Sequence, residues 1–171
     1  MHLAYVALGS NLQEPIKQVN QAVTALEQLP NTRILKKSSL YQTAPIDCGV
    51  DLQNPVPDFI NAVAEIETEL TPLALLAELH AIENVAGRER PYVNAPRVLD
   101  CDLLLYENVM LNTTKLTLPH PRMHTRGFVL LPLFEIAPHL SLPNHGKIAT
   151  LITPELSLGI KRLPYTAHEY F

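Results

Sequence analysis

Apolar residues along this chain follow two spacings, one near two residues and one near 3.6 residues. Short runs that alternate or stay apolar throughout predict strands, and longer runs with apolar side chains three to four residues apart predict helices. The predicted strands cover residues 3–8, 34–41, 59–67 and 98–105, and the predicted helices cover 15–29, 72–87 and 122–136. The third helix contains Pro132, where we expect an interruption or a kink.

Turns and loops separate these elements. Residues 9–11, Gly-Ser-Asn, predict a turn after the first strand, and residues 109–118 are expected to form a hairpin partner of the fourth strand. Prolines interrupt residues 42–58 and 88–96, which we assign to two loops, and long loops in compact domains are commonly functional. Prolines also break the chain beyond Pro138, where we assign no element.

Strands in runs, with helices packed against one side of them, predict an α+β fold. We expect a ferredoxin-like α/β sandwich with a mostly antiparallel sheet, formed by a single domain over residues 1–171. The composition agrees with this expectation, because a chain of 171 residues with 47% hydrophobic and 18% charged residues can bury a globular core.

Charge and cysteine content narrow the class of protein. The net charge of −4 argues against a nucleic-acid partner, since nucleic-acid-binding domains usually carry a basic face. The apolar run at the N-terminus is too short for a signal peptide or a membrane span. Cys48 and Cys101 have no spacing typical of a disulfide framework or a metal site. We therefore expect a cytoplasmic protein that binds neither nucleic acid nor membranes. We also expect a monomer, although none of these observations bears on the oligomeric state.

Two aspartates interrupt the apolar strand at residues 98–105. Because side chains alternate along a strand, Leu99, Cys101, Leu103 and Leu105 are expected on one face and Val98, Asp100, Asp102 and Leu104 on the other. The Cα atoms of the two aspartates would lie ~6.6 Å apart, at a rise of about 3.3 Å per residue. Two such charges are costly in a half-buried sheet unless cations neutralise them, and a pair of Mg²⁺ ions would do so. A solvent-facing edge strand is the alternative.

The arginines are concentrated near this strand. Five of the seven, Arg88, Arg90, Arg97, Arg122 and Arg126, fall within 39 residues that also contain both aspartates. The guanidinium group matches phosphate oxygens, and carboxylates that hold Mg²⁺ among arginines are typical of a polyphosphate site. The chain has no Walker or Gly-x-Gly-x-x-Gly motif, so we expect side chains and metal to hold any nucleotide.

Residues 95–104, Ala-Pro-Arg-Val-Leu-Asp-Cys-Asp-Leu-Leu, resemble the signature of the 6-hydroxymethyl-7,8-dihydropterin pyrophosphokinases of folate biosynthesis. Further blocks at residues 5–12, 38–45, 59–62, 87–90 and 118–130 resemble other segments of that family in the same order. The resemblance implies transfer of a pyrophosphoryl group from ATP to the hydroxymethyl oxygen of the pterin, with AMP as the second product.

The resemblance further implies roles for individual residues. Asp100 and Asp102 would hold two Mg²⁺ ions, Arg88 and Arg97 would neutralise charge on the phosphates, and Arg90 would help to close a loop over ATP. The other positions around the nucleotide would be Lys115, Thr117, His120 and Arg126, and those around the pterin would be Thr43, Pro45, Ile46, Phe59, Asn61 and Phe128. A flat ring suits two aromatic walls, and an amide can both donate to it and accept from it.

Other functions stay open at this point. A nucleotide-sugar transferase also uses an Asp-x-Asp pair with a metal, usually in a larger chain, and would release a nucleoside diphosphate in place of AMP. A non-enzymatic ferredoxin-like module that binds a ligand or regulates a partner would not need five arginines beside two aspartates. His120 and His124 could bind zinc, although no glutamate follows the first histidine as in zinc proteases.

Overall fold

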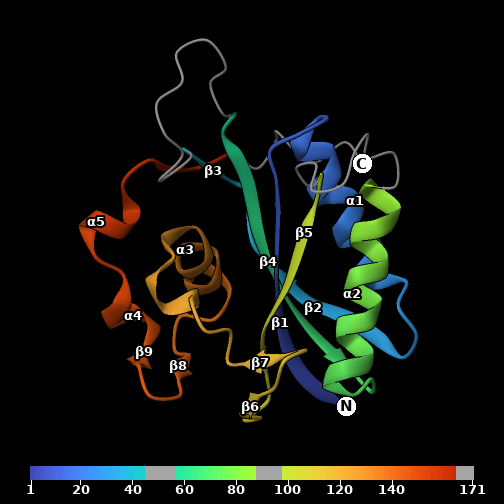
Figure 1. Cartoon of the computed structure of the whole chain (residues 1–171). Coiled ribbons are helices and arrows are strands. Elements are labelled where there is room, and N and C mark those ends of the chain that lie inside the picture. Colours follow the sequence, from blue (N-terminus) through green and yellow to red (C-terminus); the bar gives the residue numbers. More distant parts are fainter. Residues whose placement is uncertain (45–56, 88–97, 165–171) are drawn as a thin grey trace.

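One antiparallel sheet forms the centre of the molecule (Figure 1). The structure is a computed structural model, and it describes residues 1–44, 57–87 and 98–164. The strands lie in the order β10 (Ile160–Arg162), β3 (Tyr41–Thr43), β4 (Phe59–Thr68), β1 (His2–Ser10) and β5 (Asp100–Tyr106), and β2 (Thr32–Lys37) pairs with the other half of β4. The long central strands β4 and β1 are rich in Val, Ile, Leu and Ala, as expected for strands covered on both faces.

Helices cover both faces of the sheet, whereas we expected them on one side. The helices α1 (Pro15–Glu27) and α2 (Pro72–Gly87) lie on one face, and α3 (Gly127–Ile136) lies on the other (Figure 1). The α+β class with a mostly antiparallel sheet is confirmed. None of the helices in the described ranges is long and apolar enough to span a bilayer.

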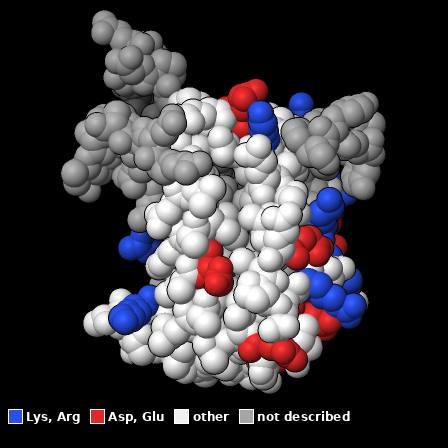
Figure 2. Space-filling model, turned by 90° about the vertical axis from the view of Figure 1, so that its right-hand side faces the viewer, with Lys and Arg blue, Asp and Glu red and all other residues white. Residues whose placement is uncertain are grey.

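Alternation along the strands produces two hydrophobic cores. Val6 and Leu8 of β1 face α1 and α2, where they meet buried side chains such as Leu26 and Leu79. Tyr5 of the same strand faces α3 and its leucines. Fully burying one leucine contributes about 1.5–3 kcal/mol, so these alternating positions fix which face each helix covers. On the face formed by α1 and α2, acidic and basic side chains are interspersed around a wide uncharged area (Figure 2).

The strand predicted over residues 34–41 is two strands, β2 and β3. Ser38 lies between them and bonds to Val63 of β4 in place of a regular pair of backbone hydrogen bonds. Its amide donates to the carbonyl oxygen of Val63 at 2.9 Å, and its Oγ accepts from the amide of Val63 at 2.9 Å. The turn predicted at residues 9–11 begins later than expected, because β1 continues through Ser10.

A bulge in β5 makes the faces of that strand differ from the predicted ones. Tyr5 pairs with Leu105 while Val6 pairs with Leu103, so Leu104 is an extra residue in β5. An extra residue reverses the alternation beyond it. Leu105 consequently packs with Leu104 against the α3 side, and its predicted place on the Cys101 face is wrong.

Two further predictions change in the C-terminal half. The strands β6 (Leu111–Asn112) and β7 (Thr117–Leu118) pair with each other in a separate small sheet and not with β5. The predicted helix at 122–136 divides into the 3₁₀-helix η1 (Met123–Thr125) and α3, with Arg126 extended between them, and α3 runs through Pro132.

Beyond Pro138 the chain forms several short elements. They are β8 (Ser141–Leu142), β9 (Gly146–Lys147), α4 (Ile148–Leu151), α5 (Pro154–Ser157) and β10. β8 and β9 form a hairpin, and β10 returns to the main sheet beside β3. The chain therefore closes the α3 side of the sheet with a segment in which the sequence predicted no element (Figure 1).

Candidate active site

Strand register brings the candidate residues into one row across the sheet. Gly9 of β1 pairs with Asp100 on one side and with Asn61 on the other. Asn61 in turn pairs with Tyr41 of β3. Because directly paired residues point to the same face, Asp100 and Asn61 both face the α3 side, and Gly9 leaves the space between them open.

A cavity of about 280 Å³ occupies this space between the sheet and the start of α3. Seven residues predicted from the sequence line it: Thr43, Phe59, Asn61, Asp100, Asp102, Arg126 and Phe128. The remaining lining residues are small or aliphatic and include Ala7, Gly9, Ala44, Ala62 and Val129. Convergent polar groups in a largely apolar cavity are typical of a small-molecule site.

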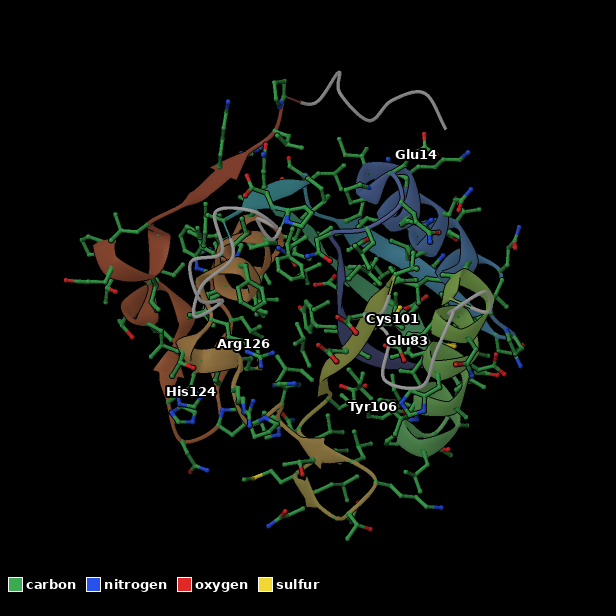
Figure 3. All side chains as sticks on the ribbon, turned by 45° about the horizontal axis from the view of Figure 1, so that its top comes forward. Glu14, Glu83, Cys101, Tyr106, His124 and Arg126 are labelled. Atoms are coloured by element: carbon green, nitrogen blue, oxygen red, sulfur yellow. The ribbon has the colours of Figure 1, made fainter. Side chains whose placement is uncertain are left out.

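The two aspartates lie at the edge of this cavity on β5. Asp100 is exposed and Asp102 is half-buried, so both carboxylates can reach a ligand in the cavity. Carboxylate oxygens are the ligands that Mg²⁺ prefers, so the pair fits the expected metal. Arg126 lines the cavity from the α3 side and faces β5 across the open centre of the site (Figure 3).

Cys101 lies between the aspartates and points away from the cavity into the core. Burial raises the pKa of its thiol, and the charges of Glu83, Asp102 and Asp100 raise it further. Its amide donates to Oε2 of Glu83 at 2.8 Å, which fixes the backbone between the two aspartates from α2 (Figure 3). Sequence reasoning missed Glu83, because its partner is a backbone amide 18 residues away and no local spacing indicates it.

The part of the cavity lined by β3, β4 and α3 combines aromatic side chains with a buried polar pair. Asn61 Nδ2 donates to Thr43 Oγ1 at 3.0 Å, and both side chains are buried. That bond leaves Asn61 Oδ1 beside Gly9, where a Cβ atom would lie only 2.8 Å from it. Phe128 is half-buried, and the Cζ atom of Arg126 lies 5.6 Å from the centroid of its ring, within the range of a cation–π contact.

His120 lies near Asp102 and is not among the residues that line the cavity. Burial lowers the pKa of His120, the charge of Asp102 opposes that shift, and Arg126 and Arg122 lower the pKa further. Its Nδ1 accepts from the amide of Arg122 at 3.2 Å, which leaves Nε2 to carry the proton of the neutral ring. A neutral imidazole with an Nε2 donor can bind an oxygen of a phosphate group.

The zinc alternative finds no support in this arrangement. His124 stacks on His145, with ring centroids 3.8 Å apart and an interplanar angle of 11°. Within the ranges that the structure describes, no three potential metal ligands among His, Cys, Asp and Glu come together.

The structure leaves the other predicted positions outside the cavity or outside its described ranges. Lys115 is exposed in the turn between β6 and β7, and Thr117 is half-buried on β7. Pro45, Ile46, Arg88, Arg90 and Arg97 lie outside the described residues. Sequence reasoning also missed the small residues of β1: Ala7 pairs with Asp102 as Gly9 pairs with Asp100, and this Ala-x-Gly alternation was the available signal.

A family model described as 7,8-dihydro-6-hydroxymethylpterin-pyrophosphokinase (HPPK) matches residues 5–138. The chain belongs to this family. The match covers every described residue that lines the cavity.

Relatives of this HPPK family member share most of its length. The 2-amino-4-hydroxy-6-hydroxymethyldihydropteridine pyrophosphokinase of Haemophilus influenzae is 49% identical over 152 residues, which cover 89% of this chain and 92% of that protein. The protein of the same name from Pseudomonas aeruginosa is 43% identical over 160 residues, 94% of this chain and 96% of its own. Because the family model and both relatives are pyrophosphokinases, this chain is a pyrophosphokinase as well.

Solved structures share the fold at lower identity. The crystal structure of Plasmodium falciparum HPPK-DHPS with SDX-DHP superposes with a TM-score of 0.68 at 16% identity. The alignment covers 95% of this chain and 47% of that one, so this chain spans about half the length of the HPPK-DHPS chain. The ferredoxin-like fold of HPPK is therefore confirmed for this chain.

Proposed function

We propose that the cavity between β1, β4, β5 and α3 is the active site in which this pyrophosphokinase works. The reaction transfers pyrophosphate from ATP to 6-hydroxymethyl-7,8-dihydropterin and gives AMP and the pterin diphosphate, a step of folate biosynthesis. The observation that carries the proposal is the convergence of two carboxylates, an arginine, a buried amide and two phenylalanines on one cavity.

The end of the cavity between Phe59 and Phe128 suits the pterin. A flat heteroaromatic ring gains most from contact with aromatic side chains on its faces and from hydrogen bonds at its edge. Asn61 supplies an oxygen directed to the cavity, and its amide is fixed by Thr43. Pro45 and Ile46 were predicted from the sequence to contact the same ring, and they remain predictions.

The end of the cavity near β5 suits the triphosphate. Asp100 and Asp102 would hold Mg²⁺ there, and the metal would neutralise phosphate charge and polarise the phosphoryl oxygens. Arg126 adds a guanidinium group on the opposite side, and His120 adds a neutral N–H donor. Arg88, Arg90, Arg97, Lys115 and Thr117 complete the predicted set around ATP.

Placement of the hydroxymethyl oxygen beside the β-phosphorus of ATP is the main task of such a site. Binding both substrates in one cavity converts a bimolecular encounter into a reaction between neighbours, and this can lower the barrier by ~7–11 kcal/mol. The guanidinium group of Arg126 then acts where negative charge develops on the transferring group.

An assay of AMP release tests the proposed function. The protein is incubated with ATP, Mg²⁺ and 6-hydroxymethyl-7,8-dihydropterin, and we expect AMP and the pterin diphosphate in equal amounts. A nucleoside diphosphate as the product would instead indicate a nucleotide-sugar type of transfer, and no turnover of ATP with the pterin would indicate a binding module.

Variants of the aspartates test the site. We expect Asp100→Ala and Asp102→Ala each to abolish turnover while the far-UV spectrum stays unchanged, because each removes a metal ligand from the surface of β5. Asp58→Asn, an exposed aspartate outside the cavity, is the matched control and should retain full activity. Activity close to that of the unsubstituted protein in either alanine variant would refute the metal assignment.

A further inference from the structure

A second polar cluster joins α3 to the sheet, next to the cavity but outside it. The Glu135 carboxylate of α3 accepts a hydrogen bond from the Ser39 amide at 3.0 and 3.1 Å to its two oxygens, from Ser39 Oγ at 3.0 Å and from the Tyr41 hydroxyl at 2.8 Å. Arg162 Nη2 donates to the same carboxylate at 3.3 Å, and Arg162 Nε donates to Ser39 Oγ at 3.0 Å. We refer to Ser39, Tyr41, Glu135 and Arg162 as the Glu135 cluster.

The Glu135 cluster shares two elements with the pterin end of the cavity. Glu135 lies seven residues after Phe128 on α3, which is about two turns, so both side chains are on the same side of the helix. Tyr41 and Thr43 are two residues apart on β3, so their side chains also point to one face of the sheet. Thus α3 and β3 are joined by Glu135 and Tyr41 at one point, and the cavity opens between Phe128 and Thr43 further along.

The chain beyond the family match supplies the third part of the cluster. The family model ends at residue 138, whereas Arg162 belongs to β10. β10 pairs with β3, and the carbonyl of Gly159, just before β10, accepts from the amide of Ala44 at 2.9 Å. Ala44 lines the cavity, so this C-terminal strand contacts the backbone of the pterin wall directly.

Charge makes the cluster specific for a carboxylate at position 135. All the groups around Glu135 are donors, and hydrogen bonds to an ionised group contribute more than those between neutral groups. Burial raises the pKa of Tyr41, and the bond to Glu135 and its charge raise it further, so the hydroxyl stays protonated and donates. A glutamine at this position would turn an amide N–H₂ group toward some of these donors.

We propose that Glu135 is a positioning residue for the pterin: together with Arg162 it sets the distance between α3 and β3 and thereby the width of the cavity between Phe128 and Thr43. The inference rests on the proposed function of the cavity. Glu135 does not line the cavity, and it acts through Tyr41 and Ser39 on one side and through α3 on the other.

Steady-state kinetics with both substrates test this inference. We expect Glu135→Gln to raise the KM for the pterin about tenfold, a change that corresponds to ~1.4 kcal/mol, while the KM for ATP changes less than about twofold. Tyr41→Phe should shift the pterin KM in the same direction by a smaller factor. Arg162→Ala should have the smallest effect of the three, because its side chain is 61% exposed and exposed ion pairs contribute little.

Lys161→Ala is the matched control, since Lys161 is the exposed neighbour of Arg162 on β10. We expect both KM values of this variant to equal those of the unsubstituted protein. Isothermal calorimetry with the pterin alone should repeat the order of the effects without turnover. Tyr41→Phe keeps the test decisive if Glu135→Gln does not fold.

The outcomes separate this inference from the proposed function. No AMP release by the unsubstituted protein refutes the proposed function itself. Equal increases of the two KM values in Glu135→Gln and Tyr41→Phe, or a lower melting temperature with unchanged KM values, would overturn the positioning role while leaving the proposed function intact.

Discussion

Replacing Gly9 with alanine tests the geometry of the cavity more directly than removing a charged residue. The Cβ atom of Gly9→Ala would lie 2.8 Å from Asn61 Oδ1, a separation that real Cβ atoms do not show. An ordinary contact begins near 3.4 Å, so one of the two groups must move by about 0.6 Å. Asn61 has little freedom to move, because it is 8% exposed and its amide is bonded to Thr43.

The size of the effect follows from three contributions. Inserting a methyl group against a neighbour that has little freedom to move costs about 1–3 kcal/mol. Losing the Asn61–Thr43 hydrogen bond costs a further ~0.5–1.5 kcal/mol, and alanine in a strand offsets these losses by roughly 0.5–1 kcal/mol relative to glycine. We expect a net loss of about 2 kcal/mol in the free energy of unfolding, or roughly 4–8 °C in melting temperature for a domain of this size.

Binding should change for one ligand only. Because Asn61 lies at the pterin end of the cavity, we expect Gly9→Ala to weaken pterin binding at least about tenfold by calorimetry, ~1.4 kcal/mol, with the affinity for ATP almost unchanged. A double-mutant cycle with Asn61→Ala isolates the cause, because the second-nearest atom to the new methyl group is the carbonyl oxygen of Ile60 at an ordinary 3.8 Å. If Gly9→Ala costs as much stability in the Asn61→Ala background, the overlap with Asn61 is not the reason.

Three more changes probe the two ends of the site and the core beside it. Phe128→Ala should weaken pterin binding by roughly 1–3 kcal/mol in calorimetry and leave the affinity for ATP nearly unchanged. Phe134→Ala, 39% exposed on the same helix, should affect neither ligand, and equal losses for both ligands in Phe128→Ala would identify Phe128 as a core residue. Arg97→Ala should lower the steady-state kcat by about 10²-fold or more, and a change confined to the KM for ATP would refute its role in stabilising the transferring group. In a Cys48→Ser background, iodoacetamide at pH 8 should modify Cys101 only after denaturation, because burial raises the pKa of its thiol and the thiolate is the reactive form; rapid labelling of the native protein would contradict this.

Local patterns predicted the elements well where one face is clearly apolar. Alternation along β5 placed Asp100 and Asp102 together on one face and Cys101 in the core, and the structure agrees for these three residues. The same rule failed at Leu105, because one extra residue at Leu104 reverses the faces and a run of three leucines gives no polar residue to reveal it.

The assembly of the cavity depended on register between distant segments, which local patterns do not contain. Gly9, Asn61 and Asp100 meet because β1 pairs with both β4 and β5, over separations of 52 and 91 residues. The strand pattern indicated both aspartates as site residues and the family resemblance supplied Asn61, but Gly9 was interpreted only as part of a turn. Gly9 has to lack a side chain because a Cβ atom there would overlap Asn61, and this is evident only once the two strands are paired.

The segment beyond Pro138 shows how a chain with little periodicity can still contact the site. A Cβ atom on Gly127, the first residue of α3, would lie 1.8 Å from the carbonyl oxygen of Leu156. Gly159 has a φ of +73° and directs its carbonyl to Ala44. These two glycines let the segment lie against both sides of the cavity, beside Phe128 and beside Thr43. Close contacts at glycine residues leave no periodic spacing in the sequence, so the part of the chain in which no element was predicted still contacts the walls between which we place the pterin.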